Sequence, residues 1–71
     1  MKLGKYLHSK SGKEYEVIGF GKYSETNEDV VIYKALYKNP LSEIWVRPLE
    51  MFEEEVQVNG KKVPRFQFLG N

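Results

Sequence analysis

The longest stretch of β-type pattern in the chain runs from Val30 to Tyr37. β-Branched and aromatic residues dominate it, which is typical of a strand. Because side chains alternate between the two faces of a strand, one face carries Val31, Tyr33 and Ala35, and the other carries Lys34. We therefore expect the Tyr33 face to be buried and the Lys34 face to be wetter.

A first hairpin is predicted near the start of the chain. The polar turn from Lys10 to Lys13 contains a glycine and separates two strand-like runs, 5–9 and 14–20. The inward alternation of the second run slips near Gly19. A glycine inside a strand often marks a bulge or a sharp bend, so we expect an irregularity there.

A second hairpin is predicted by Asn59-Gly60, which lies between the runs 53–58 and 61–69. A two-residue type I′ turn needs positive φ at both central positions, and Asn-Gly is the pair that adopts it most readily. The resulting register places Val56 opposite Val63 and Val58 opposite Lys61.

Pro64 interrupts this second hairpin because it has no N–H for the ladder. We expect it at an edge or a bulge. Beyond it, Glu54 or Glu55 is expected to face Arg65.

Between the hairpins, the segment Trp45 to Phe52 changes from strand to helix at Pro48. Pro48 cannot continue a ladder, but its fixed φ suits the first position of a helix. We therefore expect a strand over 44–47 and a single helical turn over 48–52. Leu49 and Phe52 are three residues apart and share one face of that turn, which is expected to plug an open end of the sheet.

Alternation along the 44–47 strand places Trp45 and Arg47 on one face and Ile44 and Val46 on the other. If Ile44 and Val46 face the core, Trp45 and Arg47 lie together on the opposite face.

These elements predict a mainly β protein forming a single small domain over residues 1–71. Short strands, an early bend and a terminal hairpin favour a small, strongly bent SH3-like barrel of five to six antiparallel strands with one short helical turn. An OB-like barrel is the alternative. A sandwich usually needs more residues.

Composition adds constraints on stability and environment. The 71 residues include five Tyr, four Phe and one Trp, so aromatic rings must supply much of a small core. The absence of cysteine excludes disulfides and is compatible with a reducing cytoplasm. No apolar run approaches the length of a membrane span, and we expect a cytoplasmic protein without a membrane partner.

The net charge of +1 argues against a dedicated nucleic-acid binder, which is usually clearly basic. Charge is nevertheless unevenly distributed. Lysines dominate the first third, and acidic residues cluster at 25–29 and 50–55.

Six segments together resemble a bacterial family of small domains of unknown function, catalogued as number 1653. They are GKYLH (4–8), YEVIGFG (15–21), SETNE (24–28), VIYKALY (31–37), WVRPLEMF (45–52) and VPRF (63–66). The resemblance extends from Gly4 to about Leu69, and it implies an SH3-type β-barrel that occurs alone or appended to other proteins. It implies no activity. The resemblance implies a histidine immediately before SET, where this chain has Tyr23, so a pairing of that histidine with His8 is not expected here.

Recognisable catalytic chemistry is sparse. His8 is the only histidine and cysteine is absent, so a Cys-His pair and a His-rich metal site are excluded. A Ser-His-Asp arrangement with Ser24 and Asp29 lacks a nucleophile elbow. Oxygen ligands at Glu25, Glu28 and Asp29 lack EF-hand spacing. We therefore predict neither an enzyme nor a cofactor or metal.

The remaining candidates point to a binding module. If Trp45 and Arg47 share an outward face, they can form a shallow aromatic and basic site with Arg65 and His8. The expected ligand is an acidic peptide, a carboxylate or another small polar group, and the protein is expected to be a monomer or a weak homodimer. A nucleic-acid-binding barrel is the alternative function. The competing structural interpretation places these rings in the core and pairs the arginines with acidic neighbours.

Overall fold

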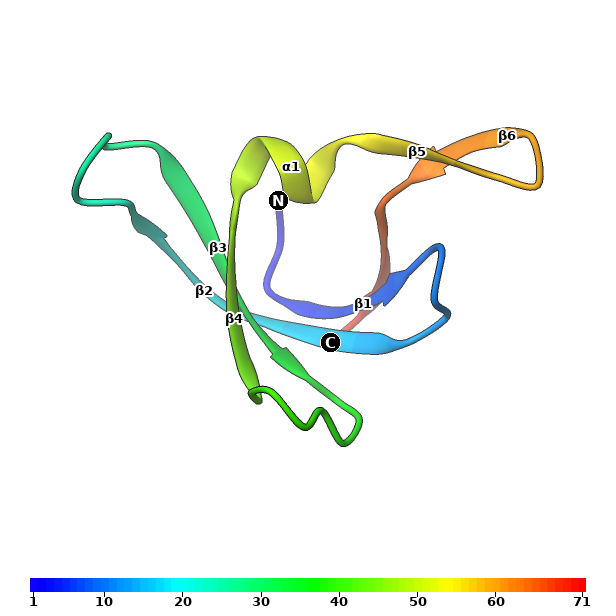
Figure 1. Ribbon diagram of the computed structural model, residues 1–71, viewed down its shortest axis with the longest axis horizontal. Helices are drawn as coiled ribbons and strands as arrows, with labels where there is room; N and C mark the ends of the chain where they lie inside the picture. The colour runs from blue at the N-terminus through cyan, green and yellow to red at the C-terminus, as the bar shows by residue number, and fades with distance from the viewer.

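The computed structural model covers residues 1–71 and contains seven strands and one short helix (Figure 1). The elements are β1 (Gly4–His8), β2 (Glu14–Lys22), β3 (Asp29–Ala35), β4 (Ile44–Pro48), α1 (Leu49–Glu53), β5 (Glu55–Val58), β6 (Lys61–Pro64) and β7 (Phe66–Gly70). The helix has five residues, and no helix is long and apolar enough to cross a membrane.

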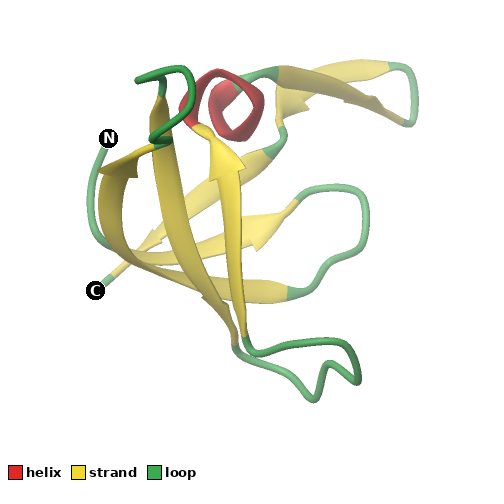
Figure 2. Cartoon of the chain, turned by 60° about the vertical axis from the view of Figure 1, so that its left-hand side comes forward, coloured by secondary structure: helices red, strands yellow, loops and turns green.

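Five strands form one antiparallel sheet in the order β4-β3-β2-β1-β7. The sheet curls strongly, α1 lies at one open end, and the separate β5–β6 hairpin extends away from it (Figures 1 and 2). The predicted mainly β class is confirmed. The edge strands β4 and β7 are not hydrogen-bonded to each other, so the pairing forms no closed barrel.

The structure has more strands than the five to six expected, because the predicted run 61–69 divides into β6 and β7. The division falls at Arg65, directly after Pro64. Pro64 ends the hairpin strand, and the chain then leaves the hairpin to pair with β1 in the large sheet.

Both predicted hairpin turns are confirmed. Asn59 and Gly60 have φ values of 53° and 78°, and the register pairs Val56 with Val63 and Val58 with Lys61. Residues between β1 and β2 include Gly12 with a φ of 72°. The positive φ values explain why these turns have Asn and Gly.

The predicted irregularity near Gly19 is a register shift between Val17 and Gly19 in the β2–β3 ladder. One extra residue, Ile18, is accommodated there. Val17 is 1% exposed and Ile18 is 45% exposed, so the bulge sends Ile18 to the outer face while Val17 stays in the core.

The inner face of the curled sheet holds the core. Val31, Tyr33 and Ala35 are buried, as the alternation in β3 predicts. The central cluster consists of Tyr6, Val17, Val31, Tyr33, Phe52 and Phe66. Four of these six residues are aromatic, so ring packing supplies most of the core.

Helix α1 begins one residue later than predicted, because Pro48 still ends β4 with an extended ψ of 139°. Phe52 is 1% exposed and stacks on Phe66 with a centroid distance of 4.0 Å and an interplanar angle of 2°. Leu49 packs against the same cluster. The expected plug is therefore confirmed.

The condition for an outward Trp45 and Arg47, that Ile44 and Val46 face the core, is not met in β4. Ile44 and Val46 are exposed, whereas Trp45 and Arg47 are partly buried. The ladder pairs Trp45 with Tyr33 and Arg47 with Val31, and directly paired residues share a face of the sheet. Since Tyr33 and Val31 point into the core, Trp45 and Arg47 must also lie on the inner face.

Replacing Phe52 tests the plug. Phe52→Ala removes a fully buried ring, and we expect the free energy of unfolding to fall by about 3 to 5 kcal/mol in chemical denaturation. The matched control is Met51→Ala in the same helical turn, where the side chain is 45% exposed and the effect should be small. Equal effects of the two substitutions would contradict the plug.

Replacing Gly60 tests the second hairpin. Gly60→Val forces a β-branched residue to a φ of 78°, and we expect a loss of more than about 1 kcal/mol in the free energy of unfolding. Gly60→Asn is the control, because Asn tolerates positive φ. A melting temperature unchanged by Gly60→Val would overturn the assignment.

Candidate functional site

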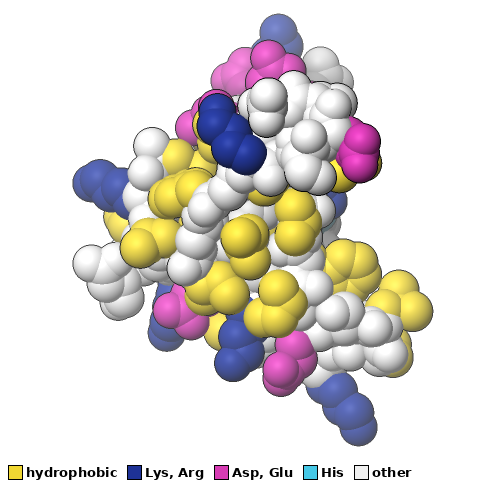
Figure 3. Space-filling model, turned by 90° about the vertical axis from the view of Figure 1, so that its left-hand side faces the viewer, with side chains coloured by type: hydrophobic (Ala, Val, Ile, Leu, Met, Phe, Trp, Pro, Cys, Tyr) yellow, Lys and Arg dark blue, Asp and Glu magenta, His cyan; other side chains and the backbone are white.

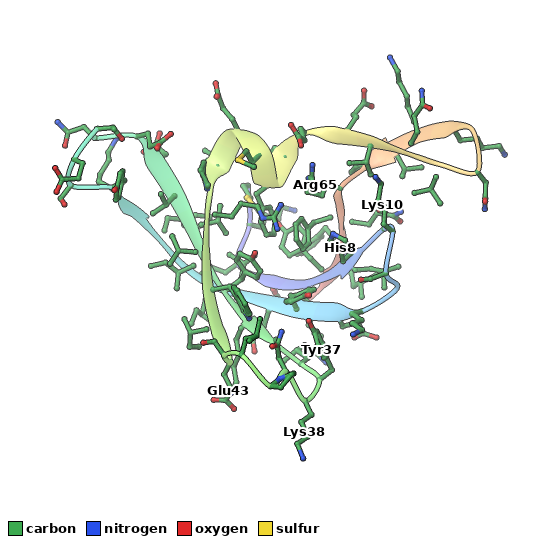
Figure 4. All side chains as sticks on the ribbon, viewed as in Figure 1. His8, Lys10, Tyr37, Lys38, Glu43 and Arg65 are labelled. Atoms are coloured by element: carbon green, nitrogen blue, oxygen red, sulfur yellow. The ribbon has the colours of Figure 1, made fainter.

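On the inner face, polar side chains from three segments meet around the ring of Phe66. The His8 ring at the end of β1 lies 5.0 Å from the Phe66 ring, centroid to centroid. Arg47 near the end of β4 places its Cζ atom over the same ring at 5.7 Å. Arg65 directly precedes Phe66, and Figure 4 shows it beside His8 and Lys10. We call His8, Arg47 and Arg65 the basic cluster.

Arg47 is partly buried and has no carboxylate partner. Its Nε donates a hydrogen bond to the hydroxyl of Tyr33 at 3.3 Å, and its guanidinium makes a cation–π contact with Phe66. The two ion pairs in the structure join Lys22 to Asp29 and Arg65 to Glu54. The charge of Arg47 is therefore uncompensated by any acidic side chain within ion-pair distance.

Arg65 is held in place from both sides. Its side chain forms the predicted pair with Glu54, and its backbone N–H donates to the Glu54 carbonyl at 2.9 Å. Its own carbonyl accepts from the Ser9 N–H at 2.9 Å. The Nε of Arg65 is buried without a hydrogen-bond partner, although most buried polar atoms have one.

The turn after β1 fixes the tautomer of His8. The backbone N–H of Ser11 donates to His8 Nδ1 at 3.2 Å, so Nδ1 is an acceptor. The Ser11 hydroxyl lies 2.8 Å from the same nitrogen and itself accepts the Lys13 N–H at 3.3 Å. The neutral ring therefore carries its proton on Nε2.

Burial lowers the pKa of His8 below its ordinary value of 6.5, and the positive charges of Arg47, Arg65 and Lys10 lower it further. At neutral pH the ring is uncharged and presents an Nε2–H donor. The cluster thus combines the unpaired Arg47, Arg65 in its pair with Glu54, and a neutral donor at His8.

Tyrosines form the wall of the site beside His8. Tyr15 lies edge-to-face against His8 and Phe66 at 6.3 and 5.7 Å, and its hydroxyl is 2.6 Å from that of Tyr37. Asn39 donates to the Tyr37 hydroxyl at 3.1 Å. Burial and the hydrogen bond to Tyr37 raise the pKa of Tyr15, so its hydroxyl is uncharged at neutral pH.

Trp45 shares the inner face with Arg47 but does not join the cluster. Its indole N–H donates to the Ser42 carbonyl at 3.1 Å, and its ring packs against the core. The outward stacking surface expected for Trp45 is therefore absent. Trp45 supports the core beside Arg47.

The structure assembles three of the four predicted site residues and adds others that sequence reasoning missed. Tyr33 orients Arg47, Phe66 supports both Arg47 and His8, and Ser11 fixes the His8 tautomer. Ser11 stands three residues after His8 in a polar turn, a spacing that could have indicated the contact.

The alternative chemical sites do not form. The β1–β2 register places His8 near the start of β2, whereas Ser24 and Asp29 follow its far end, so no Ser-His-Asp arrangement arises. No three His, Asp or Glu side chains gather as a metal-binding group. Tyr23, which stands where the family resemblance implies a histidine, is half exposed and belongs to the turn between β2 and β3.

The electrostatic effect of Arg47 on His8 can be measured as a change in the pKa of His8. We expect Arg47→Gln to raise the pKa of His8 in an NMR titration, because a nearby positive charge is removed. Lys22→Gln, which changes an exposed lysine paired with Asp29, should leave it unchanged. If the pKa of His8 is the same in Arg47→Gln as in the unchanged protein, the two side chains do not interact.

The same pKa shift has a consequence for stability. Since folding lowers the pKa of His8, the unfolded chain binds more protons as the pH falls below about 6.5. The free energy of unfolding should therefore decrease as the pH drops from 6.5 to the folded-state pKa. His8→Gln should flatten this part of the denaturation profile.

Comparison with known proteins places the chain in a family. No curated protein matches it. The crystal structure of a family protein from Bordetella bronchiseptica superposes with a TM-score of 0.92 and 33% sequence identity, covering 99% of this chain and 88% of that one. The model of the family described as "Protein of unknown function (DUF1653)" matches residues 4–68. The chain therefore belongs to the DUF1653 family.

Proposed function

We propose that this domain is a binding module that recognises a carboxylate, presented by an acidic peptide or a small acid, through the basic cluster. The observation that carries the proposal is the state of Arg47, a partly buried arginine with no acidic partner. A charge removed from water is costly unless it is paired, so such an arginine favours an anionic ligand.

The hydrogen bonds already made by Arg47 favour a carboxylate. Its Nε is used by Tyr33, which leaves the two terminal nitrogens as a planar fork. This fork matches the two oxygens of a carboxylate. The Nε2–H of His8 supplies a further donor, and the positive charge of Arg65 acts on the same ring.

Nucleic-acid binding is the weaker alternative. Single-stranded binding needs ring faces on which bases stack. Here the Phe66 ring is stacked on Phe52, Tyr33 is buried, and Trp45 packs on the core. These rings therefore offer little stacking surface.

An enzymatic role is also weakly supported. Ser11 and His8 have the composition of a nucleophile and a base, with Oγ and Nδ1 2.8 Å apart. A general base must become an imidazolium, and Arg47, Arg65 and Lys10 disfavour that charge. We propose that the Ser11 contact serves to orient His8.

We propose further that the curled sheet is an SH3-like barrel that is open between β4 and β7. Its strong bend, its short strands and the single helical turn after β4 support this relationship. The contact of Arg47 on β4 with Phe66 on β7 joins the two edges through side chains, in place of hydrogen bonds.

The proposed function can be tested by NMR titration of the isotope-labelled protein with an oligoglutamate peptide, single-stranded RNA and single-stranded DNA at two salt concentrations. Oligoglutamate should shift the resonances of His8 and Arg47, and the pKa of His8 should rise because a bound carboxylate stabilises the imidazolium. Arg47→Gln should weaken binding about tenfold or more, the scale of a lost charge-assisted hydrogen bond.

Lys22→Gln provides the matched control, since it removes one positive charge far along β2 from His8. A response to RNA or DNA that weakens with salt, with none to oligoglutamate, would replace the proposal by the nucleic-acid alternative. No response to any of the three would reject a ligand-binding role for the cluster.

A further inference from the structure

The outer face of the sheet carries an apolar surface that no part of the chain covers. Ile18, Ile44 and Val46 are 45%, 44% and 61% exposed. The ladder pairs Ile32 with Val46, so Ile32 lies in the same patch. Figure 3 shows hydrophobic side chains gathered on this side of the molecule, with charged side chains mostly around them. We call Ile18, Ile32, Ile44 and Val46 the outer patch.

Two glycines of β2 lie beside the outer patch and leave the backbone there without side chains. Gly19 is paired with Ile32 and Gly21 with Val30, and a Cβ atom at Gly21 would contact both Val30 and Ile32 at ordinary van der Waals distance. Without side chains at these positions, the backbone of β2 is open to close approach from outside. The patch therefore offers exposed apolar side chains beside a stretch of backbone that a partner can approach closely.

We propose that the outer patch associates with the outer patch of a second copy of this chain. The charges at its border support a homotypic partner. Glu16 and Lys34 are opposite each other in the β2–β3 ladder and form no ion pair with each other. In a two-fold dimer, the same surface of both copies forms the interface. Lys34 of each copy can then pair with Glu16 of the other copy. The net charge of +1 opposes such self-association only weakly.

Association through the face is favoured over association through the edge of β4. The Ala35 N–H donates to the Glu43 carbonyl, and the alternation of the ladder then turns the N–H and C=O of Ile44 away from β3. The Ser42 hydroxyl bonds both of these groups, at 3.2 and 2.9 Å. Pro48 has no N–H to offer, so little of this edge is free to pair with another strand.

The size of the outer patch sets the strength of the dimer. Strands about 4.8 Å apart that rise about 3.4 Å per residue give three strands of five residues an area of about 250 Å². Stable interfaces bury about 800 Å² on each partner. The dimer should therefore be weak and in rapid exchange, with a dissociation constant of about 1 mM.

Concentration dependence tests the proposal directly. Between about 0.05 and 2 mM protein, diffusion measured by NMR should slow, and the methyl resonances of the outer patch should shift. Val46→Lys should abolish both effects without unfolding the domain, because this side chain is exposed. Leu41→Lys is the matched control, since Leu41 is 83% exposed and lies in the β3–β4 loop.

A charge exchange makes the test specific for a second copy. Lys34→Glu and Glu16→Lys should each weaken association, and the double variant should restore it because both pairs between the copies return. Diffusion that is constant over the whole range, shifts that map to the inner face, or equal effects of Val46→Lys and Leu41→Lys would overturn the proposal. Val46→Lys should leave any oligoglutamate response intact, so the two surfaces are tested separately.

Discussion

The stack of Phe52 on Phe66 is the contact on which the rest of the structure depends. Phe52 comes from the single helical turn and Phe66 from the last strand, and their rings are parallel at 4.0 Å. The sheet is open between β4 and β7, so no backbone hydrogen bonds join these edges. Tyr6 and Tyr33 then pack edge-on against Phe52 at 5.5 and 5.4 Å. Side-chain packing thus joins the edges β4 and β7, which no backbone hydrogen bonds connect. A chain of this size therefore needs many aromatic rings.

The same stack couples the core to the basic cluster. Phe66 is a core residue, yet Arg47 lies over its ring and His8 lies against its edge. Tyr33 is similarly shared, because its ring is buried and its hydroxyl accepts from Arg47. The polar groups therefore stand on packed side chains, so little conformational entropy would remain to be lost on binding of the proposed ligand. In this protein, stability and the geometry of the site rest on the same side chains.

Features set by local residue chemistry, such as turns, could be predicted from the sequence. Features that depend on which face of a strand is buried could not. Asn59-Gly60 fixes the hairpin register, and this register brings Glu54 to Arg65. The alternation in β4 is evident from the sequence, but alternation alone does not say which face is buried. Ile44 and Val46 are the more hydrophobic pair, yet they lie outside, because the β3–β4 register places Trp45 and Arg47 opposite the buried Tyr33 and Val31. The contacts of Tyr33 and Phe66 with the cluster join distant strands, which no spacing along the chain reveals.

The position of Arg47 is the strongest physical argument that the inner face has a purpose beyond stability. Its ladder partner is Val31, which is completely buried, and its guanidinium packs on Phe66. A Met or Leu could fill this place and contact the same rings without the cost of removing a charge from water. One hydrogen bond to a tyrosine and one cation–π contact offset that cost only in part. A charge kept at such a place is best explained by an anion that completes its coordination, and this connects the unusual energetics of one side chain to the proposed ligand.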